Sequence, residues 1–187
     1  MLAANGPGPK LAARAAEVLK EHFELDGLVS IGFCGALAPE LKPCDVLVAT
    51  SLVAAAHAVS VPRSHSCQRP PATLLSTDQV AATAESKRTL HTQTQADAVE
   101  MEAAGLAPLA AGWHIPFYAV KAVTDTAAES FPLDFNRLRD AQGRFSRGKI
   151  IAAALHKPVA FPALMKLNRR CKHAAEALGD FIADARF

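Results

Sequence analysis

The charge-free stretch at residues 46–62 constrains the fold more than any other part of the sequence. It contains no Asp, Glu, Lys or Arg, but it is shorter than the about 20 apolar residues that a membrane-spanning helix needs. Polar residues also interrupt it, at Thr50, Ser51, His57 and Ser60. Because Val and Leu are frequent in it, we predict two buried strands, the first over residues 45–53. Such strands need other layers to cover them.

Helical and strand patterns alternate along the chain. After Pro9, apolar residues recur with a helical period at Leu11, Ala15, Val18, Leu19 and Phe23. Strands are predicted over residues 27–33, 72–76 and 116–124, a glycine turn over 32–35, and a loop over 62–71. Further helices are predicted from Thr77 or Asp78 to about Leu90 and over residues 100–113, 147–155 and 163–183. This alternation in 187 residues predicts a single three-layer α/β domain spanning residues 1–187.

Composition excludes several classes of protein. The formal net charge is +2, and the basic residues near the C-terminus lack the interleaved aromatic residues of a nucleic-acid platform. The four cysteines show neither CxxC spacing nor His partners, so we expect reduced thiols and no metal site. Gly6-x-Gly8 lacks the third glycine of a dinucleotide fingerprint, so no cofactor is expected. The sequence shows no secretory leader, and we expect a cytoplasmic protein.

Two acidic segments carry the candidate chemistry, AVEMEAA at 98–104 and KAVTDT at 121–126. Asp125 follows a predicted strand, and ligands of α/β sheets bind beyond the carboxyl ends of strands. It is a candidate general acid, with a turn-capping role as an equal alternative. Glu100 and Glu102 would point about 200° apart in a regular helix. One would then clamp a sugar diol while the other caps the helix or forms an ion pair; the pair taken alone is more typical of a solvated helix start.

Glycine pairs occur at Gly6-x-Gly8 and Gly32-x-x-Gly35, at predicted junctions where backbone groups could approach an anion or a sugar. A tight turn is the simpler interpretation of each pair. Cys34 lies inside the second pair, and no histidine is placed to activate it. We therefore expect a small buried side chain there rather than a nucleophile.

Together, these segments resemble the purine nucleoside phosphorylase and uridine phosphorylase superfamily, which includes the methylthioadenosine/S-adenosylhomocysteine nucleosidases. The matching motifs are IGFCGAL at 31–37 with LKPCDV at 41–46, AVEME at 98–102, and VTD at 123–125. The tail, with FPLDF at 131–135, is similar to the branch associated with hopanoid biosynthesis, whose proposed substrate is adenosylhopane. The resemblance implies a nucleoside phosphorylase-like, three-layer α/β/α fold with a mixed central sheet.

The resemblance also implies roles for individual residues in cleavage of a purine nucleoside. Asp125 would protonate the purine at N7 while the ribose becomes oxocarbenium-like, and Glu102 would hold the ribose hydroxyls. Glu100 would play a supporting or structural part. The resemblance places the remaining substrate contacts at Met101 under the sugar, at Thr124 beside the base, and at Cys34, Gly35, Val80 and Gly8.

The sequence departs from the family pattern in three places. Phosphorolytic members carry an arginine and a serine for phosphate where this chain has Ser30 and Phe33. This favours water over phosphate as the nucleophile. Cys44 stands in place of a usual glycine, which we interpret as a structural change. The strands that normally precede Gly6 are missing, so we expect an N-terminally shortened sheet with an exposed edge, and a homo-oligomer or a substitute strand to cover it.

Three functional hypotheses follow. The first is an enzyme that hydrolyses the N-glycosidic bond of a small purine nucleoside, with a lipid-linked nucleoside such as adenosylhopane as one candidate. The second is a catalytically degenerate nucleoside-binding protein of the same fold. In the third, the basic C-terminal segment lies on an anionic membrane. This segment carries Lys157, Lys166, Arg169, Arg170 and Lys172 around Leu164, Leu167, Leu178, Phe181 and Ile182. Packing of that segment on the sheet is the favoured alternative to the third.

Overall fold

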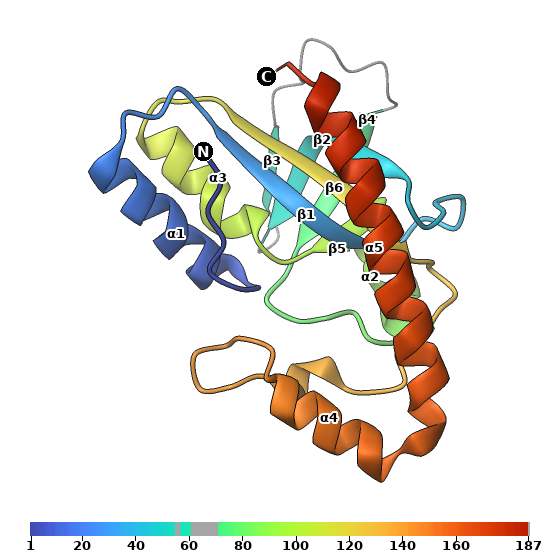
Figure 1. The fold of residues 1–187 in the computed structure, drawn as a ribbon. Coiled ribbons are helices and arrows are strands. Elements are labelled where there is room, and N and C mark those ends of the chain that lie inside the picture. The colour runs from blue at the N-terminus through green and yellow to red at the C-terminus, as the bar shows by residue number, and fades with distance from the viewer. Residues whose placement is uncertain (55–56, 61–70, 187) are drawn as a thin grey trace.

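The computed structural model describes residues 1–54, 57–60 and 71–186. The predicted loop at 62–71 therefore lies almost entirely outside the described residues. Figure 1 shows the elements along the chain. In order, they are α1 (Pro9–His22), β1 (Leu28–Ala36), β2 (Val46–Ala54), β3 (His57–Ser60), β4 (Pro71–Ser76), α2 (Ala84–Thr94), β5 (Ala98–Glu100), α3 (Ala103–Gly112), β6 (Phe117–Asp125), η1 (Phe135–Leu138), α4 (Arg147–His156), η2 (Pro158–Ala160) and α5 (Phe161–Asp184).

The sheet is mixed and largely closed on itself. Its strand order is β3-β2-β4-β5-β1-β6, and β2 also pairs with β6. The pairs β1–β6, β2–β4 and β4–β5 are parallel, whereas β1–β5, β2–β3 and β2–β6 are antiparallel. Five strands thus form a ring, with β3 attached to β2. The predicted mixed central sheet is confirmed.

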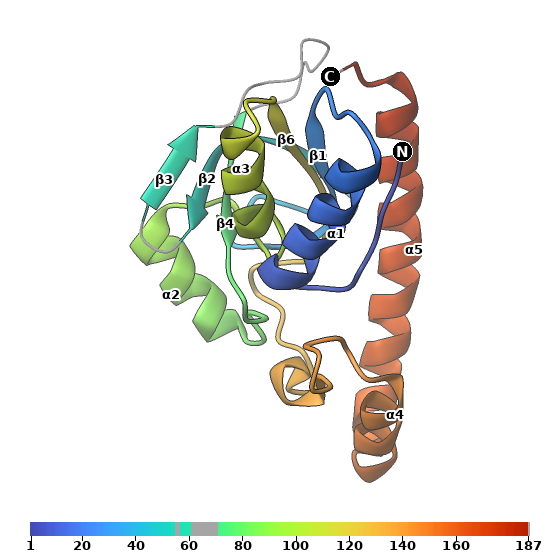
Figure 2. The same cartoon turned by 90° about the vertical axis from the view of Figure 1, so that its left-hand side faces the viewer.

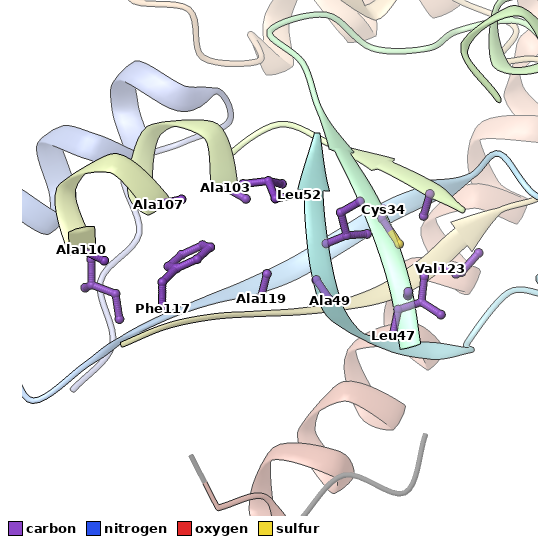
Figure 3. Packing of buried hydrophobic residues seen from close by; sticks show 14 of the residues in the cluster. Cys34, Leu47, Ala49, Leu52, Ala103, Ala107, Ala110, Phe117, Ala119 and Val123 are labelled. Carbon is purple, nitrogen blue, oxygen red and sulfur yellow. The ribbon is translucent and has the colours of Figure 1, made fainter. Parts of the chain in front are cut away.

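Helices cover the sheet on both sides, as the three-layer prediction requires. α1 and α3 lie side by side on one side, and α5 runs along the other (Figures 1 and 2). Small residues allow α3 to approach the strands closely, since its buried positions are all alanine. Figure 3 shows this face of the core, with Ala103, Ala107 and Ala110 near Phe117 and Ala119. On the other side, Ala174 and Leu178 of α5 pack against valines of β2 and β6.

Three predicted boundaries are wrong, each for a local reason. Residues 32–35 were predicted to form a glycine turn but belong to β1, which continues through them with a register shift between Cys34 and Gly35. The predicted helix at 100–113 begins only at Ala103, because Ala98–Glu100 pairs with β4 and β1. The helix predicted from position 77 or 78 begins at Ala84, where Thr83 forms a capping box with Ser86.

Cys44, which replaces the usual glycine, adopts a left-handed backbone conformation with φ of 74°. Glycine occupies this region without steric cost, whereas other residues are strained there. The position therefore keeps the conformation that suits glycine, which agrees with a structural interpretation of the change.

One edge of β1 is open in its first two thirds. Among the described residues, Leu28–Phe33 pair only with β6, and the pairing with β5 begins at Gly35. The side chains of Ile31 and Phe33 are 39% and 42% exposed. In the described structure, this part of β1 therefore presents an open strand edge with apolar side chains.

The contact between α1 and α3 depends on Gly105. A Cβ at this position would lie 2.0 Å from the carbonyl oxygen of Pro9. We expect Gly105→Ala to push the helices apart and lower the free energy of unfolding by about 1–3 kcal/mol, measured by urea denaturation. Gly112→Ala on the same helix is the control, because no atom lies within 4 Å of its Cβ position. It should be neutral or stabilise by up to about 1 kcal/mol. A stable Gly105→Ala variant would contradict the close packing.

Glu129 fastens α5 to the segment that follows β6. It accepts hydrogen bonds from Arg170 at 2.5 Å, Lys166 at 3.2 Å and the Thr126 amide at 3.0 Å. Partial burial alone would raise the pKa of Glu129, but these bonds and the charge of Arg170 lower it from 4.5 to about 2. Because the folded pKa is depressed, the stabilisation is complete above pH 4.5 and is lost as the pH falls towards 2.

We therefore expect Glu129→Gln to lower the melting temperature at neutral pH. The difference from the wild type should shrink between pH 4.5 and about 2, which thermal unfolding across that range would measure. Glu176→Gln, at an exposed position of α5, is the control. A difference that does not change with pH would show that charge is not the cause.

Candidate active site

A cavity of about 1270 Å³ runs along β1 from Gly27 to Gly35, and we call it the β1 cavity. The segment before α1 and residues from α5 also line it. Most of the residues predicted to bind substrate line this cavity. These are Asp125, Glu102, Met101, Cys34, Gly35, Thr124 and Val80. Gly8 is not among the lining residues; its Cβ position lies 3.0 Å from Asp78 Oδ1.

Asp125 lies at the end of β6 and is 4% exposed. Its two carboxylate oxygens have different partners. The Thr124 hydroxyl donates to Oδ1 at 2.7 Å, and the ammonium of Lys87 donates to Oδ2 at 2.5 Å. A Cβ on Gly35 would lie 3.0 Å from Oδ2, so the carboxylate packs tightly against the backbone of Gly35. Asp125 is therefore a positioned group of the cavity rather than a turn cap.

Lys87 is a buried cation of α2, only 1% exposed. Besides Asp125, its ammonium contacts the carbonyl oxygens of Thr126 at 2.8 Å and Glu129 at 3.0 Å. The three acceptors satisfy the three N–H donors of a lysine. α2 thus holds both Asp125 and the backbone that follows it.

Lys121 is a second buried cation, in the middle of β6 and 0% exposed. Its ammonium lies 2.9 Å from Glu100 Oε2 and 3.0 Å from Glu102 Oε2. Burial alone would lower the pKa of Lys121, but the two carboxylates raise it. Burial would likewise raise the pKa of Glu100, which Lys121 and the hydrogen bonds to its carboxylate instead lower. Lys121 and Glu100 therefore form a charged pair, and the contact with Lys121 orients the Glu102 side chain.

The side chains of Glu100 and Glu102 do not diverge as they would in the predicted helix. Because Glu100 ends a strand, its side chain and that of Glu102 converge on Lys121 instead of diverging. The Glu100 carboxylate accepts from the amides of Glu102 and Ala103 at 3.0 and 3.1 Å, so it caps α3. It is 2% exposed, whereas the Glu102 side chain is 27% exposed. Glu102 is thus the better placed of the two to receive a ligand.

The backbone of Val80 is already hydrogen-bonded. The side-chain amide of Asn136 accepts from Val80 N at 2.8 Å and donates to Val80 O at 3.1 Å. A ligand can therefore contact Val80 through its side chain, or through its backbone only if Asn136 moves. Met101 has a partner as well, since Arg139 Nη2 lies 3.6 Å from its sulfur. Burial raises the pKa of the Cys34 thiol, in agreement with a non-nucleophilic side chain.

Sequence reasoning missed three residues of this site. Lys121 could have been noticed in the sequence, because it is the only charged residue between Phe117 and Thr124 of an otherwise uncharged predicted strand. No sequence pattern marks Lys87 as a site residue, since a lysine in a polar helix is usually exposed and its partner Asp125 lies 38 residues away. Asn136 pairs with Val80 across 56 residues and left no local pattern either.

The charged side chains in the described lining of the β1 cavity all have one sign. Its described lining contains Glu24, Asp26, Glu100, Glu102 and Asp125, and no lysine, arginine or histidine. Both Ser30 and Phe33 line it, at the two positions where phosphate-binding side chains were expected to be missing. Within the described part of the chain, no group of three or more His, Cys, Asp or Glu side chains could hold a metal ion. The cavity therefore suits a neutral or cationic ligand better than an anion.

Comparison with known proteins identifies the family. The model of a family described as the phosphorylase superfamily matches residues 1–73 and 68–156. The chain belongs to the phosphorylase superfamily. Its phosphorylase fold is also found in solved structures at low identity. A putative methylthioadenosine nucleosidase from Weissella paramesenteroides is 22% identical, with a TM-score of 0.60 over 68% of this chain and 70% of that one.

Two further structures support the same superfamily fold. A futalosine hydrolase mutant from Helicobacter pylori is 21% identical, with a TM-score of 0.60 over 68% of this chain and 69% of that one. A methylthioadenosine/S-adenosylhomocysteine nucleosidase from S. pneumoniae, solved with a transition-state inhibitor, is 21% identical, with a TM-score of 0.60 over 79% and 77%. The predicted nucleoside phosphorylase-like fold is confirmed, and the match spans 69% and 77% of the length of these two relatives.

Removing Lys121 should leave two carboxylates without their partner inside the protein. We expect Lys121→Met to lower the free energy of unfolding by about 3–5 kcal/mol, measured by urea denaturation, because an uncompensated buried charge is costly. Adding Glu100→Gln should recover part of that loss. Lys20→Met, at an exposed position of α1, is the control and should change stability by no more than about 0.5 kcal/mol. Equal effects at positions 121 and 20 would contradict a buried ion pair.

Proposed function

We propose that this chain hydrolyses the N-glycosidic bond of a purine nucleoside. The observation that carries the proposal is the position of Asp125 and Glu102. Both line one cavity, and each is held by a buried lysine. A positioned acid at the end of a strand and a partly exposed carboxylate suit a base and a sugar diol, respectively. The names of the similar solved structures include methylthioadenosine nucleosidases and a futalosine hydrolase, which supports the reaction class.

In the proposed reaction, Asp125 delivers a proton to N7 of the base. Lys87 is the nearest proton source for that carboxylate, since its ammonium already donates to Oδ2. As the bond from C1′ to the base breaks, its electron pair goes to the base, and positive charge develops on the ribose. Water adds to C1′, and the proton that it releases restores the Asp125–Lys87 pair to its starting state. Glu102 accepts hydrogen bonds from the ribose hydroxyls and lies on the side of the growing positive charge.

Water is a more suitable nucleophile than phosphate in this cavity. Phosphate would enter as an anion beside the carboxylates of Glu100, Glu102 and Asp125, with no lysine or arginine in the described lining to bind it. The buried lysines lie behind the carboxylates that they hold. The negative lining instead favours the oxocarbenium-like transition state, because positive charge develops there.

The finer proposal is that the nucleoside carries a large apolar 5′ substituent, as adenosylhopane does. Beyond the carboxylates, the β1 cavity is lined by apolar side chains from β1, the segment before α4, α4 and α5. They include Ile31, Phe33, Phe145, Ile150, Leu167 and Ile182. β1 is nine residues long, or roughly 30 Å at about 3.3 Å per residue, so the cavity extends well beyond the length of a nucleoside.

A second candidate function is nucleoside binding without catalysis. The ion pair between Lys87 and Asp125 favours it, because a carboxylate already paired with an ammonium serves as a hydrogen-bond acceptor. Such a protein would bind a purine nucleoside at the same carboxylates and release no base.

Adenine release from adenosine or methylthioadenosine, with and without phosphate, separates these functions. We expect release that does not need phosphate. Asp125→Asn should lower kcat by about 10²–10⁴-fold, because it removes the proton carrier. Glu102→Gln should mainly raise KM.

Asp180→Asn, at an exposed position of α5, is the matched control and should keep full activity. An Asp125→Asn variant with unchanged kcat would refute the assigned acid. Nucleoside binding without release in either buffer would favour the second function. Release only with phosphate would overturn the hydrolytic assignment.

A further inference from the structure

The charge of the chain is concentrated in one segment. Residues 141–175 contain eight Lys and Arg residues and no Asp or Glu. Since the whole chain has a formal charge of +2, the remaining residues together carry −6. The segment covers α4, η2 and the first half of α5. Such an asymmetry in a nearly neutral chain indicates an interaction with an anionic partner.

The same segment exposes large apolar side chains where α4 turns into α5. We call this surface the α4–α5 elbow, and it consists of Ile151, Leu155, Val159, Phe161 and Met165. Their exposed fractions are 61%, 75%, 80%, 59% and 57%, and together with Met1 and Leu2 they are the most exposed large apolar residues of the described chain. Figures 1 and 2 show α4 and the first turns of α5 projecting beyond the end of the sheet.

Apolar and basic side chains share one stripe of α5. Phe161, Met165, Arg169 and Lys172 follow one another at spacings of four, four and three residues, and all four are exposed. Residues at these spacings lie on the same face of a helix. The apolar end of the stripe belongs to the elbow, and the basic end continues along the helix. The second half of α5 is different, because Leu178 is buried on the sheet and Phe181 and Ile182 pack against the same cluster.

We propose that the α4–α5 elbow docks on the surface of an anionic lipid bilayer. Apolar side chains that enter the boundary between headgroups and acyl chains, together with nearby cations, give this kind of binding. A second copy of the chain fits the surface less well, because it would bring two strongly basic segments together. Of the apolar residues that the sequence suggested for a membrane contact, Leu178, Phe181 and Ile182 pack on the sheet, so the contact proposed here is at the elbow.

The proposal concerns the surface and does not depend on the glycosidic reaction. Among the described residues, no single helix is long and apolar enough to cross a bilayer. One bent pair of helices, Gly148–His156 and Pro158–Asp184, reaches the required length and composition when the two are taken together. Ile150 connects the elbow with the β1 cavity, because it lines both that cavity and a groove of about 290 Å³ between α4 and α5. Docking at the elbow would therefore bring the apolar end of the cavity next to the lipid.

Co-sedimentation of the full chain with vesicles tests the proposal. One set contains phosphatidylcholine alone, and the other also contains phosphatidylglycerol. We expect the protein to pellet with the anionic vesicles and to be released by salt. Leu155→Ser/Val159→Ser should weaken binding roughly tenfold or more, because two exposed apolar side chains are lost. Val18→Ser is the matched control, since Val18 is a 48% exposed valine on α1.

A second pair of variants tests the contribution of charge to vesicle binding. Lys172→Gln should weaken binding roughly fivefold, whereas Lys20→Gln on α1 should have little effect. Thermal unfolding verifies that each variant is folded. Asp125→Asn should bind vesicles as the wild type does, so a failed glycosidic reaction and a failed docking surface give different results.

Three results would overturn the proposal. The first is no pelleting with anionic vesicles, or equal pelleting with neutral ones. The second is unchanged binding of the folded Leu155→Ser/Val159→Ser variant. The third is a dimer in the absence of lipid that this variant dissociates, which would assign the elbow to a contact between copies of the chain.

Discussion

The rest of the site depends on the ammonium group of Lys121, which lies in the middle of β6 without exposure to solvent. A buried cation is tolerated only where paired charges offset its lost hydration. Here, Glu100 and Glu102 supply that charge from the junction between β5 and α3. The ion pairs therefore fix the angle at which the chain leaves the sheet and enters α3. They also determine where the partly exposed carboxylate of Glu102 points.

Most of the fold could be predicted from the sequence because periodicity is a local property. The apolar spacing after Pro9 and the charge-free stretch at 46–62 indicated a helix and strands that the structure contains. Asp125 could be singled out because it follows a patterned strand, whereas Glu102 could be distinguished from Glu100 only through the resemblance of the AVEME segment to the family. The partners of these acids could not be predicted in the same way. Lys87 reaches Asp125 from another helix, and only the folded chain brings them together.

The boundary errors have a related cause. Glycines at 32 and 35 and acids at 100 and 102 are typical of turns and helix starts, respectively. In this chain, strand pairing overrides both local preferences, since β1 continues through its glycines and Glu100 ends a strand. One result is a narrow space beside Gly35, which the Asp125 carboxylate fills. The local preferences fail where the candidate active site is built.

β6 is paired on both sides, to β1 along its length and to β2 at Val120–Ala122, and all nine of its residues are buried. Strands of this kind exchange their amide hydrogens only when the whole domain unfolds, whereas exposed helices open locally. The α4–α5 elbow belongs to the second class. Asp125 and the elbow are therefore parts of different cooperative units. The elbow can rearrange or fray at a surface while the geometry around Asp125 persists.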